Sequence, residues 1–373
     1  MSRRILMIAG EASGDLHGAS VIREILRREP DAEVYGIGGD KMVREGLRPI
    51  YHIRELGFMG FVEVIRHLPL IRAVMFTLEQ ILKLKRPDVV VLIDYPGFNL
   101  RFARIAKKHG LKVVYYVSPQ VWAWHRSRVK KMRKLVDKML VLFPFEVELY
   151  RAEGIDVEFV GHPLLESAVS EMEEKDFRRR FDLDPAKPIL ALLPGSRRQE
   201  IEHIFPAMLS AGKALAQEYG MQLAVGVAPT LEERYLRTLY ATEGVSLVKG
   251  ATYELMDHAT FALVTSGTAT LETALFGTPM FVVYRTSWLT YLIGRLLVRV
   301  RNIGLVNIVA GRTIVPEFIQ HRATAGTLVR HGRSLLNDRQ RLDVMRADLD
   351  RVRSLLGTPG AAARVAEHIL AVA

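Results

Sequence analysis

The sequence predicts an α/β protein with parallel sheets in two domains, and three observations lead to that prediction. Short apolar runs alternate with amphipathic helical patterns along most of the chain, which is typical of repeated β–α units. The run at residues 88–93 (DVVVLI) is continuously apolar after its first residue, as expected for a central strand covered on both faces. The length of 373 residues exceeds what a single hydrophobic core usually organises.

The composition narrows the range of partners. The net charge of +11 and the pI near 9.8 favour an anionic partner, such as nucleic acid, an acidic membrane surface or a phosphorylated small molecule. The absence of cysteine excludes disulfide and thiolate chemistry. Acidic residues follow the first apolar run at once, so we expect a strand there and no signal peptide. No uncharged apolar run reaches the ~18 residues that span a bilayer, so we expect a soluble or peripheral protein.

The first predicted unit is a strand over residues 5–9, a glycine-rich turn over residues 10–15 and a helix. The turn lacks the GxGxxG spacing of a dinucleotide fingerprint, so an NAD site is weakly supported. Glu11, Ser13 and Asp15 would lie at the carboxyl end of the strand, where open α/β sheets bind ligands. Alternatively, Ser13 or Asp15 only caps the helix.

Residues 34–39 predict a second strand that runs into a glycine turn. The composition of the chain then changes in a segment between residues 58 and 86. That segment is strongly apolar, repeats at helical spacing from Leu70 to Leu82 and is bordered by arginine and lysine. A core helix preceded by a loop is the commoner explanation. The same composition suits a surface that contacts lipid, with apolar residues for acyl chains and cations for headgroups.

Asp94 directly follows the apolar strand. Partial burial at that point would raise the pKa of its carboxyl group towards a value useful for a general base. Alternatively, Asp94 forms a turn or caps the next helix. The next strand, over residues 113–117, leads to Trp122 and Trp124 beside a run of arginine and lysine. Nucleic-acid binding, a solvated basic helix face and a site for phosphate or anionic lipid all remain open there.

Strands over residues 139–143 and 158–160 precede a change of composition. Residues 166–187 are highly charged, and we predict the linker and first helix of a second domain there. The DxD pattern at residues 182–184, which holds a metal in many glycosyltransferases, lies in this solvated segment. We interpret it, and the similar pattern at residues 348–350, as chance matches and expect no metal site.

The second domain contains two strand-to-helix turns of a kind that binds phosphate. The strand over residues 189–193 ends in Gly195, Ser196 and Arg197, and the arginine fork suits phosphate oxygens. The strand from residue 261 ends in small residues whose backbone N–H groups would be open to an anion at a helix N-terminus: Ser266, Gly267, Thr268 and Ala269. Glu272, about one turn into that helix, could accept hydrogen bonds from a ribose diol. These residues could instead be ordinary helix caps, but two such turns in one domain favour a diphosphate site.

Residues 288–301 are apolar and basic without acidic residues, which makes them a second candidate for a membrane-facing element. Amphipathic, arginine-rich helices end the chain.

Seven motifs, spread in order over almost the whole chain, closely resemble those of the lipid-A-disaccharide synthase family. They are GEASGD at residues 10–15, IDYPGFN at 93–99, YVSPQVWAW at 116–124, FVGHPL at 159–164, LLPGSRRQE at 192–200, SGTATLE at 266–272 and NIVAGR at 307–312.

The resemblance implies the glycosyltransferase B fold, in which two Rossmann-like domains face a cleft and C-terminal helices return to the first domain. The expected boundaries are 1–165 for the acceptor and lipid-side domain, 166–345 for the UDP-sugar-binding domain and 346–373 for the returning helices. The implied reaction joins UDP-2,3-diacylglucosamine to 2,3-diacylglucosamine 1-phosphate, with inversion, giving a β(1→6) disaccharide 1-phosphate and UDP. No cofactor is implied.

The resemblance also implies roles for site residues. Asp94 would take the proton from the 6-hydroxyl of the acceptor, with Glu11 as the rival base. Arg197 and the helix N-termini would stabilise the leaving UDP in place of a metal ion, and Glu272 would hold the ribose. Gly97 stands where many relatives have a second acid, so the role of that acid does not carry over. The residues expected to bind substrate are Ser13, Asp15, Asn99 and Asn307.

The implied partners are the two acylated, anionic sugars and the inner face of an anionic membrane, so we expect a cytoplasmic protein peripherally associated with the inner membrane. Nucleic acid is not expected, and the oligomeric state stays open, a homodimer included. One alternative is another UDP-sugar enzyme of the same fold, an N-acetylglucosaminyltransferase or a 2-epimerase, against which residues 58–82 and 93–99 argue. The other is a non-catalytic module that binds anionic lipid or nucleic acid, which would leave the two phosphate turns and Asp94 unexplained.

Overall fold

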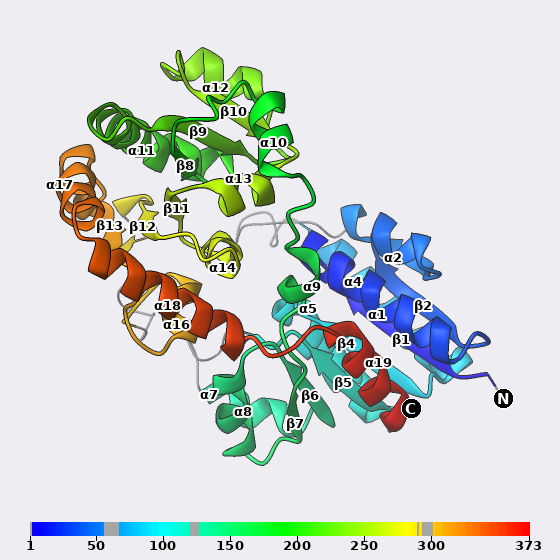
Figure 1. The fold of residues 1–373 in the computed structure, drawn as a ribbon. Coiled ribbons are helices and arrows are strands. Elements are labelled where there is room, and N and C mark those ends of the chain that lie inside the picture. Colours follow the sequence, from blue (N-terminus) through cyan, green and yellow to red (C-terminus); the bar gives the residue numbers. More distant parts are fainter. Residues whose placement is uncertain (1, 56–66, 120–126, 289–290, 293–300) are drawn as a thin grey trace. The chain divides into compact units, whose positions relative to one another are not determined.

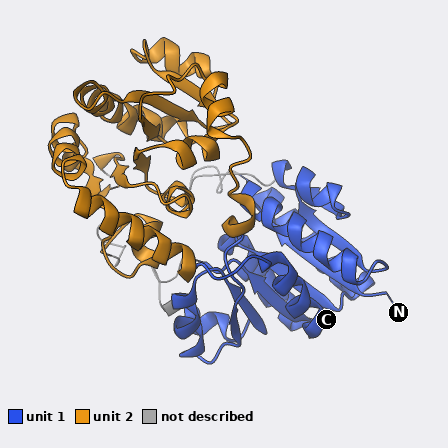
Figure 2. Cartoon of the chain, in the orientation of Figure 1, with its two compact units in different colours: residues 1–163, 356–373 blue, residues 164–355 orange. Residues whose placement is uncertain are grey.

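The structure is a computed structural model that describes residues 2–55, 67–119, 127–288, 291–292 and 301–373. The chain forms two compact units (Figure 2). Unit 1 contains residues 1–163 and 356–373, and unit 2 contains residues 164–355.

Unit 1 is built on a parallel sheet, seven-stranded over the described residues, in the order β3-β2-β1-β4-β5-β6-β7. The order of its first six strands is that of a Rossmann fold. The strands are β1 (Arg4–Ala9), β2 (Glu33–Gly38), β3 (Arg48–His52), β4 (Val89–Ile93), β5 (Lys112–Tyr116), β6 (Lys138–Val141) and β7 (Val157–Phe159).

The helices of unit 1 cover both faces of this sheet, so all five residues of β4 are buried. Helix α19 packs against α1, β4 and β5, and Figure 1 shows α1 and α19 side by side. The helical segments are α1 (Ala12–Arg28), α2 (Asp40–Arg44), η1 (Ile53–Glu55), α4 (Leu68–Lys85), α5 (Pro96–Lys108), α7 (Ser127–Met132), α8 (Pro144–Arg151) and α19 (Ala361–Val372).

Unit 2 has a second parallel sheet, six-stranded over the described residues, in the order β10-β9-β8-β11-β12-β13. Its strands are β8 (Ile189–Leu193), β9 (Gln222–Val227), β10 (Ser246–Lys249), β11 (Phe261–Thr265), β12 (Met280–Tyr284) and β13 (Glu317–Ile319). Its helical segments are α9 (Leu164–Ser167), α10 (Glu174–Arg180), α11 (Arg198–Glu218), α12 (Glu233–Leu239), α13 (Thr252–His258), α14 (Thr268–Leu275), α16 (Leu305–Val309), η2 (Gln320–Arg322), α17 (Ala325–Leu336) and α18 (Arg339–Leu355). The prediction of an α/β protein with two parallel-sheet domains is confirmed.

The C-terminal helices divide between the units. We expected residues 346–373 to return together, but residues 346–355 are the second half of α18 and belong to unit 2, whereas α19 belongs to unit 1. The physical reason is that the apolar side chains of α18 are buried in unit 2, whereas those of α19 are buried in unit 1. Met345, Leu349 and Val352 are buried in unit 2, and Val365, Ala366 and Ile369 in unit 1.

The membrane-facing segments predicted from the sequence are only partly described. Residues 58–66, Trp122 and Trp124, and most of residues 288–301 lie outside the described residues. In the part of the chain that the structure describes, no helix is long and apolar enough to cross a membrane.

Candidate functional site

Each sheet has one point at which its strand order reverses, and open α/β sheets bind ligands beyond the carboxyl ends of the strands at that point. In unit 1 the reversal lies between β1 and β4, where Ala9 pairs with Ile93, so Glu11 and Asp94 follow neighbouring strand ends. In unit 2 it lies between β8 and β11, where Leu193 pairs with Val264. The predicted catalytic carboxylates and the predicted phosphate turns therefore occupy the two reversal points.

The backbone at Asp94 is strained and is held by two side chains. Asp94 and Tyr95 have φ values of 48° and 46°, in the left-handed region that non-glycine residues rarely adopt. The carbonyl oxygen of Asp94 accepts hydrogen bonds from the Tyr115 hydroxyl, at 2.6 Å, and from Nδ2 of Asn99, at 2.7 Å. Nδ2 of Asn99 also donates to the Ile93 carbonyl at 3.1 Å. These bonds fix the turn from which the Asp94 carboxylate projects.

The carboxyl group of Asp94 has a pKa raised from its ordinary 3.8 to about 6. Burial is the largest cause because it disfavours the charged form, and the negative charge of Glu11 adds to it. The Tyr95 N–H group donates to the carboxylate and partly offsets both effects. A carboxylate with this pKa is ionised at neutral pH yet basic enough to take a proton in a transition state.

The turn after β1 approaches this site closely. A Cβ atom on Gly10 would lie 2.2 Å from Cδ1 of Tyr95, so only glycine leaves room for the Tyr95 ring. Glu11 precedes α1, is exposed and makes no capping bond with its side chain. Ser13 is exposed in the first turn of the helix. The Glu11 side chain therefore does not cap α1, and its negative charge raises the pKa of Asp94.

Asp15 fixes the start of another helix. Its carboxylate is 5% exposed and accepts hydrogen bonds from the backbone N–H groups of Gly39, Lys41 and Met42, at 2.7, 3.2 and 3.0 Å. Asp15 therefore caps α2, whereas the alternative offered from the sequence was a cap on the helix of its own turn, α1. No local signal indicates this, because the capped residues lie far along the chain.

The sequence analysis assigned no role to two histidines near this edge, of which His17 is partly buried and His162 is buried. His17, on α1, packs edge-on against Tyr116 with the ring centroids 6.2 Å apart, and His162, after β7, packs on Phe143 at 5.3 Å. Burial lowers the pKa of His17 to about 4 and that of His162 to about 3. The charge of Lys41 is the lesser cause for His17, and repulsion between the two protonated imidazoles is the lesser cause for His162. Both are neutral at physiological pH. His17 is signalled only by its place early in a helix after a strand end, whereas His162 lies in FVGHPL, one of the motifs that resemble the family.

The two turns of unit 2 lie side by side. A Cβ atom on Gly195, whose φ is +104°, would lie 3.3 Å from Cγ2 of Thr265 at the end of β11. Gly267, with φ +135°, has no atom within 4 Å of where its Cβ would be, so a ligand can approach its backbone. The hydroxyl of Thr265 is buried and has no hydrogen-bond partner among the described residues. A buried hydroxyl at a turn that has no partner within the protein can bond to a polar group of a ligand.

The second turn opens onto the N-terminus of α14. The first N–H groups of a helix, here those of Thr268 and Ala269, have no acceptor within the helix and attract an anion. Ser266 contributes in another way, because its hydroxyl donates a hydrogen bond to the carbonyl of Ile303 at 2.9 Å. Its hydrogen is therefore directed into the protein.

Arg197 and Glu272 differ in how firmly they are held. The Arg197 side chain is 68% exposed, with Nη1 at 3.2 Å from Oε1 of Glu200, so its guanidinium keeps donors for a ligand. Ser196 is exposed beside it. Oε1 of Glu272 accepts a hydrogen bond from the Tyr253 hydroxyl at 3.2 Å, and burial raises the pKa of Glu272.

Asn307 is fully buried, and its side-chain amide bonds only to neighbouring segments of unit 2. Nδ2 donates to the Val315 carbonyl at 2.9 Å and to Oε1 of Glu317 at 2.7 Å. Oδ1 accepts from the N–H groups of Ile314 and Val315 at 2.8 and 3.0 Å. Both amide hydrogens and both lone pairs are thereby occupied, as are the donors of Asn99 at the other site.

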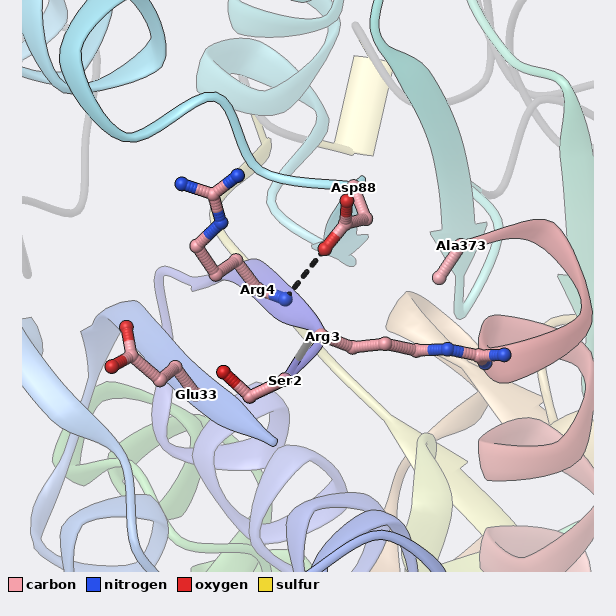
Figure 3. A pocket seen from close by; sticks show the side chains of 6 residues that line it. All are labelled: Ser2, Arg3, Arg4, Glu33, Asp88 and Ala373. Atoms are coloured by element: carbon pink, nitrogen blue, oxygen red, sulfur yellow. Dashed lines mark hydrogen bonds between the residues drawn. The ribbon is translucent and has the colours of Figure 1, made fainter. Parts of the chain in front are cut away.

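The described cavities lie away from these residues. A cavity of about 560 Å³ sits at the opposite, amino-terminal edge of the unit 1 sheet, where Figure 3 shows the Arg4 backbone N–H donating to Asp88. A cavity of about 590 Å³ in unit 2 lies between residues 312–316 and helices α17 and α18. Over the described ranges, no group of three or more His, Asp or Glu side chains is arranged to hold a metal ion. Neither cavity contains a predicted site residue.

Comparison with known families and sequences gives matches over the whole chain. The family model described as lipid-A-disaccharide synthetase matches residues 5–367. A lipid-A-disaccharide synthase of Syntrophus aciditrophicus (strain SB) is 44% identical over 369 residues, covering 98% of this chain and 96% of the relative. One of Geobacter sulfurreducens (strain ATCC 51573 / DSM 12127 / PCA) is 42% identical over 372 residues, covering 99% and 97%.

Solved structures with the same fold are distant in sequence. A UDP-GlcNAc 2-epimerase from Neisseria meningitidis, bound to UDP-GlcNAc, superposes with a TM-score of 0.67 at 14% identity, covering 99% of this chain and 100% of that one. The glycosyltransferase of kitacinnamycin superposes with a TM-score of 0.65 at 15% identity, covering 100% and 99%. At these identities the likeness establishes the fold, the glycosyltransferase B type, and nothing finer.

Proposed function

The chain belongs to the lipid-A-disaccharide synthase family and is a hexosyltransferase, and from that premise we propose how its two strand-end sites divide the reaction. The substrates are UDP-2,3-diacylglucosamine and 2,3-diacylglucosamine 1-phosphate. Unit 2 binds the donor through its diphosphate and ribose, and Asp94 of unit 1 activates the acceptor. The single observation that best supports this division is the raised pKa of the Asp94 carboxyl group, to about 6, at a reversal point of the sheet order.

Asp94 is the general base in this proposal. Its carboxylate takes the proton of the acceptor 6-hydroxyl while that oxygen attacks the anomeric carbon of the donor. The bond between the anomeric carbon and the UDP oxygen breaks in the same displacement, the electron pair leaves with UDP, and the configuration inverts to β(1→6). Tyr115 and Asn99 act as positioning residues, since both bind the Asp94 carbonyl.

The leaving UDP gains negative charge, which the turns of unit 2 stabilise. The exposed guanidinium of Arg197 and the N–H groups at Gly267, Thr268 and Ala269 supply positive charge and donors to the diphosphate. The buried hydroxyl of Thr265, which has no partner among the described residues, supports the proposal that a polar group of the donor binds at this turn. Glu272 binds the ribose with the oxygen that Tyr253 does not occupy.

Peripheral binding to the inner face of the inner membrane is the second part of the proposal, because both substrates carry acyl chains. On α4, Phe76 and Leu84 are 64% and 83% exposed on the side away from the buried Val74, Leu78 and Leu82. Arg72 and Lys83 are exposed beside them. An apolar stripe flanked by cations suits the surface of an anionic bilayer.

The decisive experiment measures UDP release from UDP-2,3-diacylglucosamine with and without the acceptor, in the presence of EDTA. We expect release that requires the acceptor, persists in EDTA and falls by at least ~100-fold in Asp94→Asn. Release of UDP without acceptor would instead indicate an epimerase-like or hydrolytic reaction. Activity that EDTA abolishes would contradict the metal-independent role of Arg197 and the helix N-termini.

A further inference from the structure

Glu317, at the start of β13, organises the segment that precedes α16. Its Oε2 accepts a hydrogen bond from the Ile303 N–H group at 2.9 Å, and its Oε1 accepts one from the Gly304 N–H group at 2.9 Å. Oε1 also accepts from Nδ2 of Asn307 at 2.7 Å. One carboxylate thus satisfies two consecutive backbone N–H groups and a fully buried amide, and bonds to a charged acceptor are stronger than neutral ones.

Little space remains for this segment to shift. A Cβ atom on Gly304 would lie 3.1 Å from Oε1 of Glu317 and 3.1 Å from Cγ2 of Val282. Asn307 holds the other end by its bonds to Ile314 and Val315. The position of the Ile303 peptide is therefore set by Glu317 on one side and by close packing on the other.

The same peptide reaches the donor-binding turn. The Ile303 carbonyl accepts the hydrogen bond of the Ser266 hydroxyl at 2.9 Å. A second link runs in parallel, because the Val306 N–H group donates to Oγ1 of Thr270 at 3.3 Å, and that hydroxyl donates to the Gly267 carbonyl at 2.8 Å. The continuous path is Glu317 to Ile303 to Ser266, and it ends at the turn with the open backbone N–H groups.

We propose that Glu317 is a positioning residue for the donor diphosphate, acting through Ile303 and Ser266. It keeps the Ser266 hydroxyl directed at Ile303, so that the N–H groups of Gly267, Thr268 and Ala269 face the diphosphate in a fixed geometry. This inference rests on the proposed function, in which that turn binds UDP. It also explains why Asn307, with its amide fully occupied, lies in a motif that resembles the family: it braces the same segment.

Glu317→Gln isolates the effect with little change of shape. The new amide NH₂ cannot accept a hydrogen bond, so at least one of the donors at Ile303, Gly304 and Asn307 loses its partner. The Ile303 peptide can then move, and the Ser266 hydroxyl loses its fixed acceptor. We expect the Kd for UDP and the KM for the donor to rise about tenfold. We also expect kcat to fall, because the same N–H groups stabilise the leaving UDP, while the KM for the acceptor stays within about twofold.

The experiment is titration of UDP into the purified full chain by calorimetry, with thermal unfolding as the check on folding. Glu218→Gln is the matched control, because Glu218 is also a glutamate of unit 2 and bonds through both oxygens, to Arg333 at 3.1 and 2.8 Å, outside the turn. We expect it to bind UDP as the wild type does. A wild-type chain that fails to bind UDP would refute the proposed function itself. A folded Glu317→Gln variant with wild-type affinity would refute only the role of Glu317.

A double-mutant cycle with Ser266→Ala tests the route. If Glu317 acts through Ser266, the double variant binds UDP no more weakly than the weaker of the two single variants, whereas losses that multiply would overturn the route. If Glu317→Gln is too unstable to purify, Ser266→Ala alone remains informative. The proposal requires weaker UDP binding in that variant, and unchanged binding would overturn it.

Discussion

Asp94 and Glu11 have neighbouring carboxylates at the first reversal point, and their charges are coupled. Burial and the Glu11 charge together raise the pKa of Asp94 to about 6. Below that pH Asp94 is protonated and cannot act as a base, so we expect kcat/KM to fall as the pH drops through about 6.

Glu11→Gln separates the two candidate bases. Removing the like charge lowers the pKa of Asp94, so the acidic limb of the profile of kcat/KM against pH should move to lower pH, with activity at pH 8 retained. The profile is measured by UDP release, with Asp94→Asn as the reference for a lost base. A loss of ~100-fold at pH 8 in Glu11→Gln would instead make Glu11 the base.

Single residues also show where sequence reasoning stopped. Asp94 could be predicted as a candidate base because it directly follows a continuous apolar run, a pattern that is visible in the local sequence. The bonds that Asn99 makes to the Asp94 turn, and those of Asp15 to α2, depend on how the backbone is folded. The resemblance, from which both were expected to bind substrate, therefore gave no sign of these bonds. The carboxylate of Glu317 carried no signal, since its partners at Ile303 and Gly304 are fixed only in three dimensions.

At the scale of an element, the turn between β4 and α5 depends on a glycine, Gly10, in the turn between β1 and α1. Because Gly10 has no side chain, the Tyr95 ring fits against it. We expect Gly10→Ala to displace Tyr95, because the new Cβ would lie 2.2 Å from its ring. The cost should be about 1–3 kcal/mol of unfolding free energy, with a larger loss of kcat because Tyr95 adjoins Asp94. Urea denaturation and initial rates measure the two effects.

Gly97→Ala is the control for that substitution. Gly97 lies in the first turn of α5, and no atom lies within 4 Å of where its Cβ would be. Alanine should therefore leave activity unchanged and stabilise the helix by up to about 1 kcal/mol. Equal behaviour of the two variants would show that the contact between Gly10 and Tyr95 does not constrain the site.

Helix α4 makes a separate prediction for membrane binding. We expect the double substitution Phe76→Ser and Leu84→Ser to weaken binding to anionic vesicles by at least about tenfold, because two exposed apolar side chains are lost. Leu239→Ser, at a residue 55% exposed in unit 2, should bind as the wild type does. Co-sedimentation with vesicles of anionic and of neutral lipid measures both. Unchanged binding of the double variant would remove α4 from the membrane surface.

At the scale of the whole molecule, the sequence predicts the repeated architecture well. Parallel strands buried on both faces are continuous apolar runs, so β4, β8 and β11 could be identified directly. The pairing order that creates the two reversal points is not visible in the sequence, because strand neighbours are chosen by packing between distant segments. For the same reason, the separation of α18 from α19 was not predicted.

The return of residues 356–373 from unit 2 to unit 1 leads to a prediction about the stability of unit 1. Leu356, Val365, Ala366 and Ile369 are fully buried in unit 1, and Arg364 donates through Nε to the Val160 carbonyl at 2.9 Å. We expect deletion of residues 356–373 to destabilise unit 1 by several kcal/mol, at roughly 1.5–3 kcal/mol for each large apolar side chain. Hydrogen exchange should show lost protection in β4 and β5 and retained protection in β8 and β9. Unchanged protection in β4 and β5 would contradict the role of α19.

The position of α19 also has a consequence for synthesis on the ribosome. Residues 164–355 are complete and can collapse as soon as they leave the exit tunnel, whereas the sheet of unit 1 must wait for its last covering helix until all of unit 2 has been translated. The half of the protein that is translated first is therefore the half that is finished last. During that interval the apolar surface destined for α19 is available to chaperones.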